Sequence, residues 1–261
     1  MSDIFPFTCA LVTGASSGIG KEITDLLGEA KIKLVLVARR TERLDAIAAK
    51  YSNVEVITAD LGTAEGLALV EQRIADTTKP IIDLVVNNAG FGSSGLVQEL
   101  DVDRLSEEIR LNVLALTRIS HAAVRAMLPR GIGYLLNVSS VASFQPSPGL
   151  AVYAATKAYV TSFTEALHQE LRSTGIRVTA LCPGLTKTEF QSISNTSGFE
   201  SKFPDYLWTS VESVAKAGLD GVAKGTPIVV PGALYKALSG ITSVLPRSAT
   251  RWLSGVVSQM R

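Results

Sequence analysis

The chain has 261 residues, of which 46% are hydrophobic and 19% charged, so it is long enough to enclose one strand layer between two helix layers. Its net charge of +1 and pI near 7.7 give no overall field for a polyanion, and the absence of a basic stripe or zinc-finger spacing argues against a nucleic-acid partner. We therefore expect one compact, fully folded chain.

The two cysteines, Cys9 and Cys182, lie in apolar strand-like segments, where buried free thiols are expected rather than a disulfide. No Cys/His cluster suggests a metal, and His121 and His168 are expected to be packing or surface residues. The first strand begins so close to Met1 that a secretory signal has no room, and no apolar stretch reaches about 18 residues. These features predict a cytoplasmic, metal-free protein.

Short β-branched runs alternate with helix-length segments along the chain. We expect seven strands: Cys9–Val12, Lys33–Ala38, Val54–Thr58, Leu84–Val86, Tyr134–Val138, Arg177–Leu181 and Ile228–Val230. Continuous apolar strands joined by helical crossovers form parallel sheets that helices cover on both faces. The sequence therefore predicts an α/β fold with a doubly wound, seven-stranded parallel sheet of the Rossmann type.

A glycine-rich turn separates the first predicted strand from the first helical stretch: Thr13-Gly14-Ala15-Ser16-Ser17-Gly18-Ile19-Gly20. Gly14 would allow the tight turn, Gly18 would let the backbone approach a pyrophosphate, and Gly20 would let helix and strand pack closely. The first N–H groups of the helix would add positive partial charge. The G-x-x-x-G-x-G spacing predicts a dinucleotide site, although such a turn can also serve only as a connection.

The second predicted strand ends at Ala38, which Arg39 and Arg40 follow. An acid at this place would bond the ribose 2′-hydroxyl of NAD, whereas an arginine can bond the 2′-phosphate of NADP through its guanidinium fork. Arg39 is predicted to bind this phosphate, and Arg40 either helps or faces solvent. The alternative is a pair of solvated arginines at the start of a helix.

Two later strands end in polar residues at the edge where open α/β sheets bind ligands. Asn87-Asn88-Ala89-Gly90 follows the fourth strand, where the Asn side chains can fix a loop and Gly90 leaves space for a ring. Ser139-Ser140 follows the fifth strand and brings hydroxyls to the same edge. Loop bracing and local strand capping are the alternatives. Asn112, inside an apolar helical stretch, needs a buried partner.

Tyr153 and Lys157 lie in the first turns of a long helical stretch, where i,i+4 spacing puts the phenol and the ammonium on one face. A free tyrosine titrates at about 10, and a nearby cation lowers that pKa, as an acid/base in carbonyl chemistry requires. On an ordinary helix, the same spacing would mean only a half-buried Tyr and a solvated Lys.

These motifs in this order, with Pro183-Gly184 after the sixth strand, resemble the short-chain dehydrogenase/reductase family over about residues 8–190. The 13-residue step from Ser140 to Tyr153 matches the family interval and favours Ser140 over Ser139. The resemblance implies that Tyr153 is the catalytic acid/base and that Ser140 orients the substrate carbonyl. It also implies that Lys157 lowers the pKa of Tyr153 and holds the nicotinamide ribose, and that Asn112 positions a proton-relay water.

The resemblance also implies NADP as the cofactor, because Ala38 occupies the family's Asp position. Many NADP-preferring relatives carry a basic residue where this chain has Ser17, so the preference could be less extreme. Asp60-Leu61 resembles the adenine contact, unless Asp60 only caps the next helix. The implied cofactor-binding residues are Gly14, Ser16, Ser17, Gly18, Ile19, Gly20, Arg39, Arg40, Asp60, Leu61, Asn88, Ala89, Gly90, Tyr153, Lys157, Pro183, Gly184, Thr186 and Thr188.

Of these, Thr186 and Thr188 belong to Pro183-Gly184-Leu185-Thr186-Lys187-Thr188, which resembles the family's P-G-x-x-x-T segment. In that segment, the backbone around Thr186 and the Thr188 hydroxyl would hold the nicotinamide carboxamide. A plain turn followed by an N-cap is the alternative.

The implied function is NADPH-dependent reduction of a ketone or aldehyde to an alcohol. The irregular stretch Ser192–Pro204, with the aromatic residues of Phe190–Trp208, is expected to be a lid over an apolar substrate. The alternatives are an NAD-linked alcohol dehydrogenase and a non-catalytic NADPH-binding regulatory protein. Relatives in the family imply a homodimer or homotetramer.

Residues 1–230 are expected to form the catalytic domain, and residues 231–261 a helical extension packed on it. The extension has no acidic residue, carries Lys236, Arg247, Arg251 and Arg261, and shows two short amphipathic helical patterns separated at Pro246. We expect their apolar faces to cover the substrate pocket or a subunit interface. Peripheral attachment to an anionic membrane is the less favoured alternative.

Overall fold

The computed structural model describes residues 5–194 and 204–244. Its centre is a seven-stranded sheet in the order β3-β2-β1-β4-β5-β6-β7, in which every neighbouring pair is parallel. The strands are β1 (Cys9–Thr13), β2 (Lys33–Ala38), β3 (Val54–Thr58), β4 (Leu84–Asn87), β5 (Gly133–Val138), β6 (Ile176–Leu181) and β7 (Ile228–Val229). The predicted fold class is therefore confirmed.

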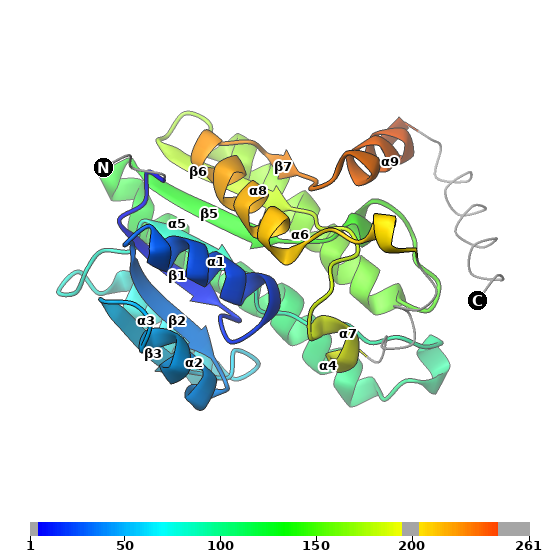
Figure 1. Cartoon of the computed structure of the whole chain (residues 1–261), viewed down its shortest axis with the longest axis horizontal. Coiled ribbons are helices and arrows are strands. Elements are labelled where there is room, and N and C mark those ends of the chain that lie inside the picture. Colours follow the sequence, from blue (N-terminus) through cyan, green and yellow to red (C-terminus); the bar gives the residue numbers. More distant parts are fainter. Residues whose placement is uncertain (1–4, 195–203, 245–261) are drawn as a thin grey trace.

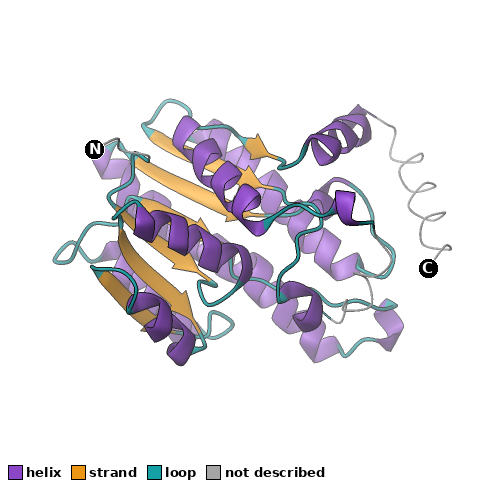
Figure 2. Ribbon diagram, in the orientation of Figure 1, coloured by secondary structure: helices purple, strands orange, loops and turns teal. Residues whose placement is uncertain are grey.

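Helices cover both faces of this sheet (Figure 2). The α-helices of the described residues are α1 (Gly18–Glu29), α2 (Thr41–Ala48), α3 (Ala64–Ala75), α4 (Val102–Ile109), α5 (Leu116–Met127), α6 (Ala151–Glu170), α7 (Phe190–Ile193), α8 (Val211–Lys224) and α9 (Ala233–Val244). In Figure 1, α1, α2 and α8 lie in front of the sheet, and α3, α5 and α6 lie behind it. The chain is thus a three-layer structure, as the doubly wound pattern predicts.

Alternation along the strands divides the core between the two faces. In β1, Ala10 and Val12 pack into the cluster that contains the buried side chains of α1, α2 and α8. Cys9 and Leu11, on the other face, pack with α3 and α5. Because side chains alternate with a period of two, a strand covered on both faces must be apolar throughout, which is why these runs are readable in the sequence.

The carboxyl ends of the central strands meet at one edge of the sheet. The strand order changes direction between β1 and β4, and ligands of open α/β sheets bind at such a point. The glycine turn follows β1, the Asn87–Gly90 loop follows β4, Ser139 follows β5 and Pro183 lies just beyond β6. The polar motifs of the sequence therefore gather at a single edge.

A π-helical turn, Arg110–Ala115, connects α4 to α5. The sequence pattern predicts an ordinary helix here, because the widened turn keeps the same apolar spacing. Turns of this kind are rare and occur mostly at functional sites. This turn carries Asn112, which is buried, with only 1% of the residue exposed.

The first of the two predicted C-terminal helices is present as α9, whereas the second lies outside the described residues. The hydroxyl of Tyr235, on α9, donates to the carbonyl oxygen of Leu207 at 2.8 Å and accepts from the backbone N–H of Leu185 at 3.2 Å. Gly184 is also essential to this contact, because a Cβ there would collide with the Tyr235 ring. The start of α9 therefore packs on the segment that follows β6.

We expect Tyr235→Phe to lower the free energy of unfolding by about 1–2 kcal/mol, because two hydrogen bonds are lost and one carbonyl is left unpaired. Denaturant titration of both proteins measures this change. An unchanged midpoint would show that the hydroxyl does not hold α9 in place.

Among the described residues, no helix is long and apolar enough to cross a bilayer. The same part of the chain contains no group of three or more His, Cys, Asp or Glu side chains that could hold a metal.

Candidate active site

The glycine turn is tight, and its shape depends on the absence of side chains. Gly14 and Gly18 have φ of 65° and 55°, in the left-handed region that glycine tolerates. A Cβ on Gly20 would lie 2.5 Å from the carbonyl oxygen of Gly14, so helix α1 could not approach β1 as closely. Helix α1 begins at Gly18, so its first N–H groups are available to phosphate oxygens beside the turn.

Asn88 and Ala89 brace this turn from β4. The Asn88 amide donates to the carbonyl oxygens of Thr13 at 2.9 Å and Gly14 at 3.3 Å. The backbone N–H groups of Asn88 and Ala89 both donate to the Thr13 hydroxyl. Asn87 is deeper and donates to Ser120 and Asn137. The hydrogen bonds of both asparagines therefore fit the alternative that these side chains brace the loop.

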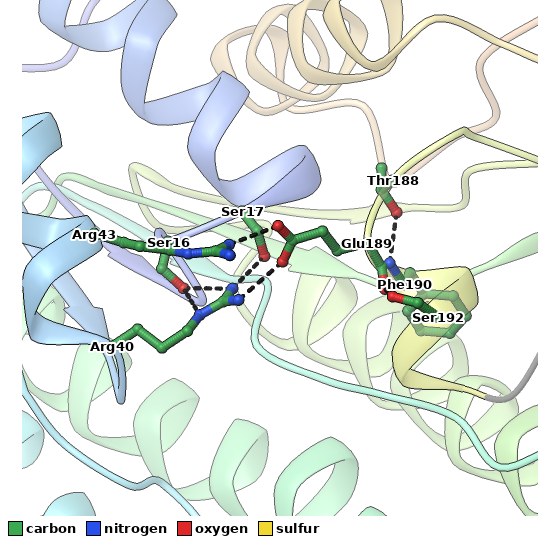
Figure 3. Close-up of polar contacts among 8 residues, drawn as sticks. All are labelled: Ser16, Ser17, Arg40, Arg43, Thr188, Glu189, Phe190 and Ser192. Atoms are coloured by element: carbon green, nitrogen blue, oxygen red, sulfur yellow. Dashed lines mark hydrogen bonds and ion pairs between the residues drawn. The ribbon is translucent and has the colours of Figure 1, made fainter. Parts of the chain in front are cut away.

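The two arginines that follow β2 have different surroundings in the structure. The Arg39 side chain is 73% exposed, with one nitrogen 3.8 Å from Asp60. Arg40 folds back onto the glycine turn and donates to the hydroxyls of Ser16 at 3.1 Å and Ser17 at 2.8 Å (Figure 3). Its guanidinium thus lies beside Ser17, the position where many NADP-preferring relatives carry a basic residue.

The segment after β3 shows which residue begins α3. Asp60 accepts from the N–H of Gly62 at 2.9 Å, whereas Thr63 is the N-cap of α3 and accepts from Gly66. The alternative that Asp60 caps this helix is therefore wrong, because the N-cap lies three residues later, at Thr63. Asp60 remains half-exposed beside the buried Leu61.

The Pro183–Thr188 segment lies directly against the glycine turn. A Cβ on Gly18 would be 3.3 Å from Thr188. The Thr188 hydroxyl accepts from the N–H of Phe190 at 3.1 Å, so it contacts the first residue of α7. The N-cap of α7 is Glu189, and its side chain makes no capping hydrogen bond. Thr186 is buried and bridges to Thr209. The segment after β6 and the glycine turn after β1 are therefore neighbours at the sheet edge.

Ser140 and Ser139 have different surroundings. Ser139 is buried and donates to the carbonyl oxygen of Lys157, so it serves packing. Ser140 accepts from the N–H of Ala142 at 3.1 Å and its hydroxyl lies beside that of Tyr153, whose pKa it lowers. The structure therefore brings Ser140, the member of the pair that the 13-residue step favours, to the tyrosine.

Tyr153 and Lys157 share one face of α6, as the spacing predicts. Burial of the hydroxyl raises the pKa of Tyr153 to about 12, against a smaller lowering by Ser140. The Lys157 ammonium lies 5.8 Å from the centre of the Tyr153 ring and donates to the carbonyl oxygen of Val138 at 2.8 Å. The ammonium thus faces the ring and the β5 carbonyl, and the implied lowering of the Tyr153 pKa by Lys157 stays a prediction.

Asn112 joins the β4 loop to α6. Its amide donates to the Phe91 carbonyl at 2.8 Å and to the Thr156 hydroxyl at 3.1 Å, and its oxygen accepts from the Phe91 N–H. The loop after β4 is therefore the buried hydrogen-bond partner that was predicted for Asn112. A Cβ on Gly90 would lie 2.8 Å from the Asn112 oxygen and 3.6 Å from the Lys157 nitrogen, which explains the glycine.

Sequence reasoning missed Glu108, which lies one helical turn before Asn112. Its side chain is fully buried, and neither carboxylate oxygen has a hydrogen-bond partner of normal geometry among the described residues. Burial raises the pKa of Glu108, and a carboxylate there raises the pKa of both Tyr153 and Lys157. The only sequence signal is an acid at helical spacing from Asn112.

The free energy of unfolding is expected to depend on pH through Lys157. Burial lowers the pKa of Lys157 from 10.5 to about 8. Between these values the unfolded chain binds a proton that the folded chain lacks, so this residue makes stability rise with pH. We expect the stability of the wild type, relative to Lys157→Met, to rise from pH 8 to 10.5. Parallel stability curves for the two proteins would contradict the burial of a titrating ammonium.

Comparison with known proteins places this geometry in a family. A family model described as short chain dehydrogenase matches residues 8–197. An uncharacterized oxidoreductase of Staphylococcus aureus is 35% identical over 188 residues, which are 71% of this chain and 81% of that protein. A short-chain dehydrogenase from Sphingobium yanoikuyae, solved in complex with NADPH, is similar with a TM-score of 0.80 and 32% identity, covering 92% of this chain and 97% of that one.

A bulky-bulky ketone specific alcohol dehydrogenase from Comamonas testosteroni is also similar, with a TM-score of 0.76 and 31% identity, covering 92% of this chain and 95% of that one. The family match extends from the first strand to just beyond α7, so it includes every motif at the sheet edge. The chain therefore belongs to the short-chain dehydrogenase family of oxidoreductases.

Proposed function

We propose that this protein reduces a ketone or aldehyde to an alcohol with NADPH. The observation that carries the proposal is the pairing of the Tyr153 and Ser140 hydroxyls at the end of β5, with the Lys157 ammonium against the tyrosine ring. A substrate oxygen in contact with both hydroxyls would receive one hydrogen bond from Ser140 and the transferable proton from Tyr153.

The chain has a cradle that fits a dinucleotide. The glycine turn has no room for a Cβ at Gly14 or Gly20, and the first turn of α1 supplies N–H groups there. The Arg40 guanidinium and the exposed Arg39 lie where a ribose 2′-phosphate is expected, which supports NADP. When bound, the reduced nicotinamide supplies a hydride to the carbonyl carbon.

The phenol of Tyr153 is the proton donor in this direction of reaction. It is protonated at neutral pH, since burial holds its pKa at about 12, and it can donate its proton to the developing alkoxide. Lys157, close to the ring, would stabilise the phenolate that remains. Asn112 holds the β4 loop against α6 and so positions Gly90 beside Lys157.

An apolar substrate is proposed because aromatic rings border the tyrosine. The Phe190 ring lies 5.4 Å from that of Tyr153, and Gly92 lies close to both rings. The solved relative from Comamonas testosteroni is specific for bulky-bulky ketones, which supports a carbonyl flanked by large groups. The part of the predicted lid between Ser194 and Pro204 lies outside the described residues.

Assembly and location are also proposed. Exposed apolar side chains at Leu114 and Tyr159 support a homodimer or homotetramer. Both cysteines are free and buried, which supports the reducing cytoplasm. The contacts of Tyr235 support the C-terminal extension as a cover for the same domain rather than a membrane anchor. Sedimentation with anionic vesicles, with the full chain and one ending at Val230, tests the anchor.

The proposed activity is tested by NADPH consumption against a panel of ketones and aldehydes, with NADH in parallel. Oxidation of NADPH by at least one carbonyl, faster than with NADH, is the expected result. Faster turnover with NADH would favour an NAD-linked alcohol dehydrogenase. Tight NADPH binding with no turnover across the panel would favour a regulatory protein.

A further inference from the structure

A carboxylate from the segment between β6 and α7 pairs with two arginines near the glycine turn. Glu189 accepts from Arg40 at 2.9 Å and from Arg43 at 2.6 Å, through different carboxylate oxygens (Figure 3). We call Arg40 and Arg43 the arginine pair. It lies at the start of α2, whereas Glu189 comes just before α7, well over a hundred residues later in the chain.

Most of the donors of Arg40 are already in use. Its Nη1 donates to Glu189, its Nε donates to Ser16, and its Nη2 donates to Ser16 and Ser17. A phosphate on the ribose 2′-oxygen would need donors from this same guanidinium. The serine hydroxyls can turn and donate to a phosphate themselves, so they do not oppose it. Glu189 has only acceptors, so it does oppose it.

The charge of Glu189 is held in place. Hydrogen bonds from Arg40 and then Arg43 lower the pKa of its carboxyl, so it is negative at neutral pH. A carboxylate that contacts both members of the arginine pair cancels much of the positive potential that would attract a 2′-phosphate. NAD has a hydroxyl in place of this phosphate, and its binding does not use that potential.

We propose that Glu189 competes with the 2′-phosphate of the cofactor for the arginine pair and thereby limits the preference for NADP over NAD. The inference rests on the proposed function, because it assumes that the 2′-phosphate binds at Arg40. It makes Glu189 a specificity-determining residue next to Phe190, whose ring contacts the Tyr153 ring.

The test compares the dissociation constants of NADP+ and NAD+ for the wild type and Glu189→Gln, by calorimetry at low ionic strength. The amide keeps the shape of the side chain but removes its charge. An exposed ion pair contributes little to stability, so the variant is expected to fold. We expect NADP+ to bind roughly tenfold more tightly, the effect of one unit charge a few ångströms away in a partly solvated site, and NAD+ to change less than about twofold.

Glu42→Gln is the matched control. Glu42 is an exposed carboxylate between the two arginines in sequence, and it has no ion pair among the described residues. Its removal changes the net charge equally and should leave the ratio of the two dissociation constants nearly unchanged. Equal effects of the two variants would show a general charge effect and overturn the proposal.

Two further outcomes would also overturn it. An unchanged ratio in Glu189→Gln would mean that the carboxylate does not oppose the phosphate. Equal weakening of both cofactors would mean that Glu189 only holds α7 against α2. A wild type that binds NAD+ but not NADP+ would instead contradict the proposed function, so the two failures are distinguishable.

Discussion

Tyr153→Phe is expected to abolish carbonyl reduction while leaving NADPH binding within a few-fold of the wild type. The substitution removes the transferable proton and keeps the ring that packs against Phe190 and lies below the Lys157 ammonium. Removal of a general acid typically costs about 10²–10⁴ in rate. Because Ser140 alone cannot replace this acid, we expect the turnover rate to fall by at least the lower end of that range, about 10².

Two measurements check this expectation: steady-state rates with the best carbonyl of the panel, and NADPH affinity by fluorescence. Tyr159→Phe is the matched control, since Tyr159 lies on the same helix and its hydroxyl contacts only Thr117 at 2.9 Å among the described residues. It should reduce carbonyls at the wild-type rate. A Tyr153→Phe protein that retained near-wild-type turnover would show that another group supplies the proton.

The parallel sheet could be predicted because a strand that is buried on both faces has apolar residues at consecutive positions. Strands such as β2, with four consecutive fully buried residues, show an unbroken apolar run. Strand β7, which has only two residues and lies at the sheet edge, was the least defined, and its predicted end at Val230 extends one residue too far. The π-helical turn at Asn112 was not predictable, because its apolar spacing does not differ from that of a helix.

The site could be predicted where position in the chain alone decides contact. Residues at strand ends must meet at one edge of a parallel sheet, and residues four apart must share a helix face, so Ser140, Tyr153 and Lys157 were found together. The directions of long side chains were not predictable. Lys157 donates to the Val138 carbonyl, and Arg40 rather than Arg39 folds onto the glycine turn.

Contacts between segments far apart in the chain could not be predicted from the sequence, for a different reason. The partners of Glu189 are fixed only once the segment after β6 lies against the start of α2, and no local spacing encodes that packing. Glu108 is similar: an acid in a helical stretch normally faces solvent, and here it is fully buried. Both are acidic residues whose role depends on burial or pairing that the fold creates.

Replacing Arg40 is expected to convert the cofactor preference. We expect Arg40→Ser to weaken NADPH binding by about 1.5–3 kcal/mol, the scale of one charge-assisted hydrogen bond, and to leave NADH nearly unchanged. The double change Ala38→Asp and Arg39→Ser should weaken NADPH by a similar amount and leave NADH equal or better. The new carboxylate would accept from the ribose 2′-hydroxyl and repel a 2′-phosphate.

The ratio of kcat/KM for NADPH and NADH measures both changes. Arg125→Ser is the control for loss of a positive charge, since Arg125 is exposed on α5, behind the sheet in Figure 1. If Arg40→Ser lowered the ratio more than the double change, the guanidinium bound to Ser17 would be the main phosphate ligand. If only the double change lowered it, the exposed Arg39 would hold the phosphate, and Arg40 would serve to pair with Glu189. An unchanged ratio in both variants would reject the 2′-phosphate site at the end of β2.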